Sequence, residues 1–311
     1  MKASNYIRKL SLITLSKLFL QKHFLKPNFY LFNLDRTDLL SVKKVFFELN
    51  NPDFIHLGDH LFFIPLIRSF IDSGYHVEVG VSPLMADFFK RLGFSVLSSS
   101  PSYNDYDLTI SRFELIPQLS QFKSLLVHVS QNLTMPICNQ LLHTFSAHFQ
   151  RTFDSRTSYD VFTNSKILKT LELPEDKRLI LFNPYCDSSS YLINKTKVDQ
   201  LLKALEPFAG EPGYTIVLMG TQKEKEKDPA HYSDRYFDLR GKTDVVDIFE
   251  LVNDPRVELY VGFDAFIMHV FSLFGKRSLV KFRGRLTKRQ TKMLSKYHVN
   301  LFSDHHFVTL I

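Results

Sequence analysis

Apolar and polar positions change their spacing at regular intervals from about residue 44 to the C-terminus. Short apolar runs that end at glycine or at a polar loop predict β-strands, whereas apolar residues three and four positions apart predict helices. In the first half we expect strands at 44–49, 76–81, 94–97, 106–110 and 124–129, and helices at 60–73 and 83–92. Strands that alternate with helices of this length predict a parallel sheet covered by helices on both faces.

The same alternation starts again in the second half of the chain. It predicts strands at 178–184, 214–219, 235–239, 257–261 and 278–282, and helices at 198–208, 244–252 and 265–274. The expected fold is therefore α/β, with two Rossmann-like doubly wound domains facing a cleft, where such sheets bind ligands. We expect an extension at 1–43, an N-terminal domain at 44–160, a linker at 161–177 and a C-terminal domain at 178–311.

The N-terminal extension is basic and amphipathic. Between residues 7 and 25, leucine and phenylalanine recur at helical spacing among Lys and Arg. This pattern fits a helix packed on the domain, and it also fits a helix lying on an anionic inner leaflet. The chain has neither the long apolar run of a transmembrane helix nor the apolar centre of a signal peptide. We therefore expect a cytoplasmic protein, either free or peripheral to the inner face of the cytoplasmic membrane.

Charge and cysteine content narrow the classes of partner. The net charge of +7 favours an anionic partner such as a phosphorylated small molecule or a phospholipid surface. Nucleic acid is disfavoured because the basic residues form no single long run and no RNA-binding or zinc-finger motif occurs. The two cysteines, Cys138 and Cys186, lie far apart, which indicates a reducing compartment. His305 and His306 lack a third ligand at a useful spacing, so we expect neither a metal nor a cofactor.

A first candidate site follows the strand at 44–49, where Gly58 and Asp59 precede the helix expected at 60–73. Glycine permits a tight approach of the chain after a strand, and Asp59 then lies at a helix N-terminus. Aspartate is among the best helix caps and stabilises a helix by about 1 kcal/mol in that position. Spacing alone does not separate a cap from a catalytic carboxylate, so both interpretations stay open.

A second candidate site lies where a strand ends at Gly262 and a helix is expected to start at Asp264, with His269 further along that helix. Free backbone N–H groups at a helix start, together with the helix dipole, suit the binding of a diphosphate. The same residues also fit an ordinary capped turn with a histidine in the core. As an isolated motif, this one is weak.

Together the two motifs resemble those of glycosyltransferase family 9, the bacterial heptosyltransferases that build the lipopolysaccharide core. The first motif matches at Gly58, Asp59 and Pro65, and the second at Asp264, Met268, His269, Gly275 and Lys276. Between them, DLRGKT at residues 238–243 is similar to a DLxGKT element of the family. The three elements occur in the family's order, and the resemblance covers about residues 44–283.

This resemblance implies an activity and a role for each matching residue. Family members are inverting, metal-independent GT-B enzymes that move a sugar from a nucleotide-diphospho-sugar to a glycolipid or polysaccharide acceptor. Asp59 would be the base that deprotonates the acceptor hydroxyl, with Gly58 and His60 on the acceptor side. The residues implied in donor binding are Lys195, Lys197, Glu224, Asp264, Ala265, Phe266, Met268 and His269.

The chain also departs from the family pattern. Ala265 and Phe266 stand where the family has Thr or Ser followed by Gly, which removes a hydroxyl and crowds the approach of a phosphate. Val270 and Phe271 replace small residues. These departures keep two alternatives open. One is a catalytically impaired binding or scaffold protein on the same fold, and the other is a nucleotide-sugar epimerase, which needs no acceptor.

Overall fold

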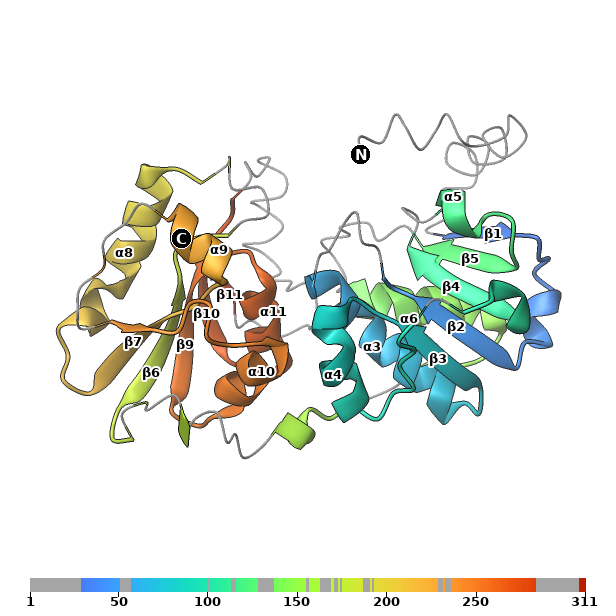
Figure 1. Ribbon diagram of the computed structural model, residues 1–311, viewed down its shortest axis with the longest axis horizontal. Coiled ribbons are helices and arrows are strands. Elements are labelled where there is room, and N and C mark those ends of the chain that lie inside the picture. The colour runs from blue at the N-terminus through green and yellow to red at the C-terminus, as the bar shows by residue number, and fades with distance from the viewer. Residues whose placement is uncertain are drawn as a thin grey trace. The chain divides into compact units, whose positions relative to one another are not determined.

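The computed structural model describes residues 29–50, 57–99, 101–112, 116–127, 137–154, 157–162, 169–170, 173, 175–186, 191, 193–228, 232, 236–283 and 308–311. The chain divides into two compact units, one made of Met1–Gln131 and Ile137–Thr157 and the other of Asn132–Pro136 and Ser158–Ile311. Each unit contains its own mainly parallel sheet (Figure 1). The predicted α/β fold with two Rossmann-like domains is therefore confirmed.

The first unit is built on a sheet of order β1-β5-β4-β2-β3. Its parallel strands are β2 (Lys44–Glu48), β3 (His76–Gly80), β4 (Leu108–Arg112) and β5 (Ser124–Val127). Strand β1 (Phe29–Phe32) pairs antiparallel with β5, with Phe29 opposite Val127. This strand lies within the segment expected to be an extension, so residues 29–32 belong to the first sheet. The strand expected at 94–97 is reduced to a single bridge between Val79 and Val96.

Helices and short 3-10 turns complete the first unit. They are the turn Asp38–Leu40, α3 (Leu57–Asp72), α4 (Pro83–Arg91), the turn Tyr103–Asp105, α5 (Ile116–Leu119) and α6 (Ile137–Phe149). Helix α3 packs on the sheet through Phe70, whose ring lies 5.4 Å from that of Phe47 in β2. The same ring meets Phe145 and Phe149 of α6, so an aromatic layer joins both helices to the sheet. The abundant phenylalanine therefore fills the core here.

The second unit has a sheet of order β11-β10-β9-β6-β7-β8, in which all neighbours are parallel. Its strands are β6 (Arg178–Asn183), β7 (Tyr214–Leu218), β8 (Phe237–Asp238), β9 (Val257–Phe263), β10 (Arg277–Lys281) and β11 (Val308–Leu310). The five strands expected in this half are all present, although β8 is shorter than expected and β9 runs two residues further. Strand β11 was not expected, and it extends the sheet beyond β10.

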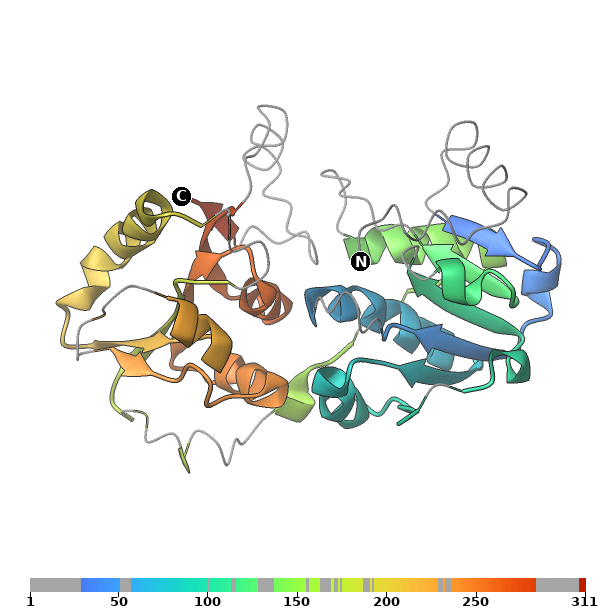
Figure 2. The same cartoon turned by 45° about the horizontal axis from the view of Figure 1, so that its top comes forward.

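Helices cover both faces of the second sheet. Besides the 3-10 turn Asp160–Phe162 they are α8 (Lys195–Ala209), α9 (Gln222–Lys227), α10 (Val245–Asn253) and α11 (Phe266–Leu273). Helix α8 lies on one face and α10 and α11 lie on the other (Figures 1 and 2). On the α8 face, Leu201 and Leu205 are buried against Ile180 and Phe182 of β6. Each unit thus has its own core.

The strand orders locate where a ligand would bind in each unit. In the first sheet the connections from β2 lead to β3 on one side and later to β4 on the other, so the direction of winding reverses between β2 and β4. In the second sheet the corresponding reversal lies between β6 and β9. Open α/β sheets bind ligands outside the carboxyl ends of the strands at such points. We therefore expect ligand-binding side chains among the residues that follow β2, β4, β6 and β9.

The remaining expectations concern the membrane and a metal. Among the described residues, no helix combines the length and apolar character needed to cross a bilayer. The amphipathic helix expected between residues 7 and 25 lies outside the described residues, as do His305 and His306.

Candidate functional site

Asp59 lies at the carboxyl edge of the first sheet, in the first turn of α3. Its Oδ2 accepts a hydrogen bond from Nη1 of Arg112 at 2.5 Å, and Arg112 is the last residue of β4. The side chains are 27% and 14% exposed, so the pair is open to solvent on one side only. Helix α3 begins at Leu57, which makes Asp59 the third residue of the helix and not the residue that precedes it. The helix therefore starts three residues earlier than expected, and the structure leaves both interpretations of Asp59, helix cap and catalytic carboxylate, open.

The two neighbours of Asp59 are also helical. Gly58 lies within the first turn of α3, and not in a turn before the helix as expected. His60 is buried, and its Nε2 accepts a hydrogen bond from the backbone N–H of Ser82 at 3.3 Å. Its ring also faces Phe89 of α4 at 6.4 Å. His60 thus links α3 to the start of α4, and its role on the acceptor side stays a prediction.

Glu48 is a titratable group at this edge that the sequence analysis did not single out. It ends β2, is buried, and accepts hydrogen bonds from the Tyr103 hydroxyl at 2.8 Å and the Asn50 N–H at 3.0 Å. Burial raises the pKa of this carboxyl to about 6, although both hydrogen bonds lower it. Its register partner is Ser111, one residue before Arg112. In the sequence, the feature that could have indicated Glu48 is a carboxylate directly after three apolar residues of a strand.

In the second unit, Asp264 follows β9 and is held by Arg283. The Asp264 carboxylate accepts hydrogen bonds from the backbone N–H of Arg283 at 2.8 Å and from its Nε at 3.1 Å. The guanidinium also donates to the Asp264 carbonyl at 2.7 Å and to Cys186 Sγ at 3.2 Å. Ala265, and not Asp264, is the N-cap of α11, and its side chain makes no capping hydrogen bond. The helix was expected to start at Asp264, but it starts at Phe266. The Asp264 carboxylate bonds Arg283 and does not cap the helix.

Two lysines of the predicted donor site lie in the first turn of α8. The loop expected there is helical from Lys195 onward, because the Asn194 side chain caps the helix by accepting from the Lys197 N–H at 3.1 Å. Lys197 Nζ donates to the backbone carbonyl of Arg283 at 2.5 Å, whereas Lys195 is exposed. The structure therefore brings Lys197, Asp264 and Cys186 together around Arg283 at the carboxyl edge of the second sheet.

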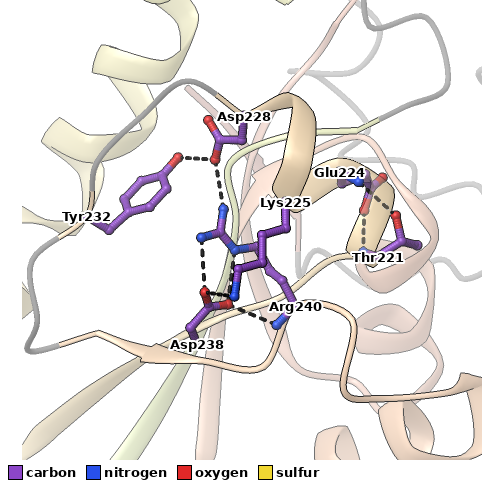
Figure 3. A network of polar contacts seen from close by, with 7 residues as sticks. All are labelled: Thr221, Glu224, Lys225, Asp228, Tyr232, Asp238 and Arg240. Carbon is purple, nitrogen blue, oxygen red and sulfur yellow. Dashed lines mark hydrogen bonds and ion pairs between the residues drawn. The ribbon is translucent and has the colours of Figure 1, made fainter.

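Glu224 has a local structural role. Its carboxylate accepts from the Thr221 N–H at 2.7 Å, and its own N–H donates to Thr221 Oγ1 at 3.1 Å (Figure 3). This reciprocal capping box starts α9 directly after Gly220, which has a φ of 148°. The predicted contact of Glu224 with a ribose stays a prediction.

The remaining donor-side residues lie in α11. The Phe266 ring leans toward Phe249 of α10, with ring centroids 6.2 Å apart, and Phe266 is only half-buried. Met268 and His269 are buried in the core of the unit. Burial, aided by the positive charge of Arg283, lowers the pKa of His269 to about 3, so this imidazole is neutral. His269 consequently brings no positive charge to a diphosphate.

The DLRGKT element forms a buried polar network around Arg240 (Figure 3). The guanidinium bonds both oxygens of Asp238, at 3.0 and 3.1 Å, and also pairs with Asp228 at 3.0 Å. Lys225 approaches Asp238 at 3.0 Å, and the Tyr232 hydroxyl donates to Asp228 at 2.8 Å. Burial raises the pKa of Asp238, but the hydrogen bonds from Arg240 and Lys225 outweigh it and hold that pKa well below its usual range. This element ties α9 to β8.

The chemistry available at the two edges differs. The first sheet offers the Asp59 carboxylate, a group that can accept a proton, held by a guanidinium, and the second offers Lys197 and Arg283, whose positive charges suit an anion. Within the described residues, no three His, Cys, Asp or Glu side chains are grouped to share a metal ion.

The comparisons with known proteins give a likeness of fold and no match of sequence. No protein-family model matches the chain, and no curated protein matches it in sequence. Solved structures nevertheless share its architecture, and among them are glycosyltransferases with the GT-B fold, which consists of two Rossmann-like domains. The chain has both of these domains.

Two solved structures illustrate the likeness. One is the glycosyl transferase family 9 protein from Veillonella parvula DSM 2008, with 12% identity over 86% of this chain and 85% of that chain and a TM-score of 0.51. The other is the E. coli heptosyltransferase WaaC with ADP, with 12% identity over 82% of this chain and 98% of that chain and a TM-score of 0.52. The resemblance to family 9 is therefore confirmed at the level of the fold.

Proposed function

We propose that this chain is an inverting, metal-independent glycosyltransferase with Asp59 as its general base. It moves a heptose or a related sugar from a nucleotide-diphospho-sugar to a lipopolysaccharide, lipooligosaccharide or surface polysaccharide acceptor. The fold shared with heptosyltransferases supports the reaction class. The observation that carries the proposal is the partly exposed carboxylate of Asp59 at the point where the winding of the first sheet reverses.

The proposed step needs one base and one stabilised leaving group. The acceptor oxygen forms a bond to the anomeric carbon while its proton passes to the Asp59 carboxylate. The bond from that carbon to the diphosphate breaks on the opposite face, and the nucleoside diphosphate leaves with the electron pair. A carboxylate suits this role because the hydroxyl becomes acidic only as the new bond forms. Gly58 and His60 are proposed to shape the acceptor side around Asp59.

The leaving diphosphate is proposed to lie at the carboxyl edge of the second sheet. Lys197 and Arg283 supply positive charge there, and the start of α11 supplies free backbone N–H groups. Arg283 takes the place of the hydroxyl that Ala265 lacks, since it reaches the same turn through Asp264. The remaining proposed donor-binding residues are Lys195, Glu224, Phe266, Met268 and His269.

Transfer assays on matched variants test this proposal. Wild type, Asp59→Asn and the control Asp199→Asn, an exposed carboxylate on α8, are incubated with ADP-, GDP- and UDP-sugars and truncated lipopolysaccharide acceptors. We expect Asp59→Asn to lower kcat by about 10²- to 10⁴-fold, and donor binding measured by calorimetry to stay unchanged. An Asp59→Asn protein as active as wild type would exclude Asp59 as the base.

A second candidate function is that of a catalytically impaired binding or scaffold protein in envelope glycan biosynthesis. It is favoured by the inward contacts of the donor-side residues: Asp264 is held by Arg283, Glu224 caps α9, and Phe266 leans on Phe249. Calorimetry against the same nucleotide-sugars separates the two functions. Failure of every donor to bind, with retained binding of a glycan acceptor, would favour the second.

We propose a cytoplasmic location, and the net charge of +7 supports peripheral contact with an anionic inner membrane. Co-sedimentation with vesicles containing about one third anionic lipid tests this contact, and we expect binding to fall as salt rises. Binding to neutral vesicles that equals binding to anionic ones would exclude an electrostatic contact. We do not expect the chain to bind nucleic acid.

A further inference from the structure

The ion pair between Arg112 and Asp59 joins two elements that flank the reversal point of the first sheet. Arg112 ends β4, and Asp59 lies 53 positions earlier in sequence, in the first turn of α3, the helix that follows β2. Strand β4 lies directly beside β2. The pair therefore spans the position where an open α/β sheet binds its ligand.

The surroundings make this pair stronger than an ordinary surface contact. Exposed pairs, such as Lys90 with Asp87, whose side chains are 58% and 85% exposed, contribute little because water screens them. Arg112 and Asp59 are largely shielded, and their N–O separation is 2.5 Å. Asp59 also lies in the first turn of α3, where the helix dipole favours negative charge. Two independent effects thus favour the ionised carboxylate.

The backbone of Arg112 is fixed by the sheet. Strand β4 is hydrogen-bonded between β2 and β5, and Arg112 pairs in register with Val127 of β5. The preceding residue, Ser111, donates its hydroxyl hydrogen bond to the Glu48 carbonyl of β2. A guanidinium anchored on a central strand fixes the direction of its partner more precisely than one on a loop. Arg112 therefore constrains the rotamer of Asp59 as well as its charge.

We propose that Arg112 is a positioning residue of the transferase, which acts through Asp59 by holding its carboxylate ionised and aimed outward from the carboxyl edge of the sheet. This inference rests on the proposed function, because it gives Asp59 the role of base. In the catalytic step the carboxylate gains the acceptor's proton and its ion pair with Arg112 weakens. Arg112 then favours release of that proton to solvent, which restores the base for the next turnover.

The test compares Arg112→Met, Arg112→Lys and a matched control. Arg112→Met keeps much of the length of the side chain without its charge, and Arg112→Lys keeps the charge without the planar fork. The control is Arg256→Met, which removes another partly buried pair, between Arg256 and Asp254 at 2.8 Å, near the start of β9 in the second unit. For each folded variant, kcat, KM and the pH profile of transfer are measured with the panel of nucleotide-sugars. Carbon-13 NMR follows the Asp59 Cγ signal, assigned with Asp59→Asn, as pH is varied.

We expect Arg112→Met to lower kcat about a hundredfold with little change in the KM of the donor. The acid limb of its pH profile and the midpoint of the Asp59 signal should both move about one to two pH units upward. Arg112→Lys should restore most of the pH shift but only part of kcat, and Arg256→Met should match wild type in both. If Arg112→Met does not fold, Arg112→Lys with its partial loss of kcat carries the test.

Two outcomes overturn the inference in distinguishable ways. If wild type transfers sugar and Arg112→Met, or Arg112→Lys in its place, keeps the wild-type kcat and Asp59 midpoint, only the role of Arg112 is excluded. If wild type transfers no sugar from any donor, the proposed function fails and the positioning role fails with it, whatever the NMR titration gives.

Discussion

The Tyr260 hydroxyl donates a hydrogen bond of 2.8 Å to the backbone carbonyl of Phe263, at the end of β9 that leads to the candidate donor site. This places the fully buried ring of Tyr260 against Gly262. A Cβ built on Gly262 would lie 2.6 Å from Tyr260 Cζ and 2.7 Å from the Asn183 carbonyl. The absence of a side chain at Gly262 is therefore required for β9 and β6 to approach each other at this edge.

Gly262→Ala should destabilise the protein by about 2–3 kcal/mol, because neither the buried ring nor the neighbouring backbone can yield without strain. Urea unfolding followed by circular dichroism measures the change. Gly213→Ala is the control, because a Cβ there meets nothing within 4 Å, and we expect it to change stability by less than about 0.5 kcal/mol. Equal effects of the two substitutions would contradict the packing argument.

Arg240→Met should cost about 3 kcal/mol, because it leaves the carboxylates of Asp228 and Asp238 without their shared guanidinium. The Asp228 side chain is only 3% exposed, so water cannot replace the lost charge easily. Arg178→Met removes an exposed pair with Glu258 and should cost less than about 1 kcal/mol. Thermal and urea unfolding of the two variants, measured side by side, check the difference. A loss as small as that of Arg178→Met would show that the network adds little.

Glu48 should make stability depend on pH in the mildly acidic range. Its folded pKa of about 6 lies above the ordinary pKa of 4.5 for a glutamate, so the folded state keeps this proton where the unfolded state has lost it. Stability therefore falls as pH rises from about 4.5 to 6.5, by about 2 kcal/mol in total. Glu48→Gln keeps an oxygen for Tyr103 and Asn50 and should remove this component. Parallel wild-type and variant curves of unfolding free energy against pH would contradict it.

Ala265→Ser should stabilise α11 by about 1 kcal/mol. Ala265 already has the extended backbone of an N-cap, with φ −126° and ψ 178°, but its side chain makes no capping hydrogen bond. Serine supplies the oxygen for the first free N–H groups of the helix. Ala209→Ser, at the last residue of α8, is the control and should cost a few tenths of a kcal/mol. A destabilising Ala265→Ser would mean that the turn cannot admit a cap.

The alternation of strands and helices was sufficient to predict both Rossmann-like sheets, because buried parallel strands and amphipathic helices differ in the spacing of apolar residues. The prediction failed where a strand is too short to show such a spacing. Strand β1, with four residues, and strand β11, with three, were not predicted, and β8 has two residues where five were expected. Each of these strands is defined by its neighbour in the sheet and not by its own pattern. The polar first turn of α8 was taken for a loop because its capping residue, Asn194, lies among other polar residues.

The candidate site was predictable in its positions but not in its pairings. Asp59 and Asp264 were singled out because each follows a predicted strand and was expected at the start of a helix, yet both were open to interpretation as caps. Their partners, Arg112 and Arg283, lie 53 and 19 residues away, and no periodicity connects them. Such pairs depend on strand order, which a single sequence leaves open. The neutral His269 likewise depends on burial that only the folded unit provides.

Strand β1 has a practical consequence for any shortened form of this protein. A version that begins at residue 44, where the regular pattern starts, would lack the antiparallel partner of β5. The N–H and carbonyl groups of Ser124–Val127 on that side would then be left as an open template for pairing between molecules. We expect such a truncation to aggregate during expression, whereas one that retains residues 29–43 keeps this side of the sheet covered.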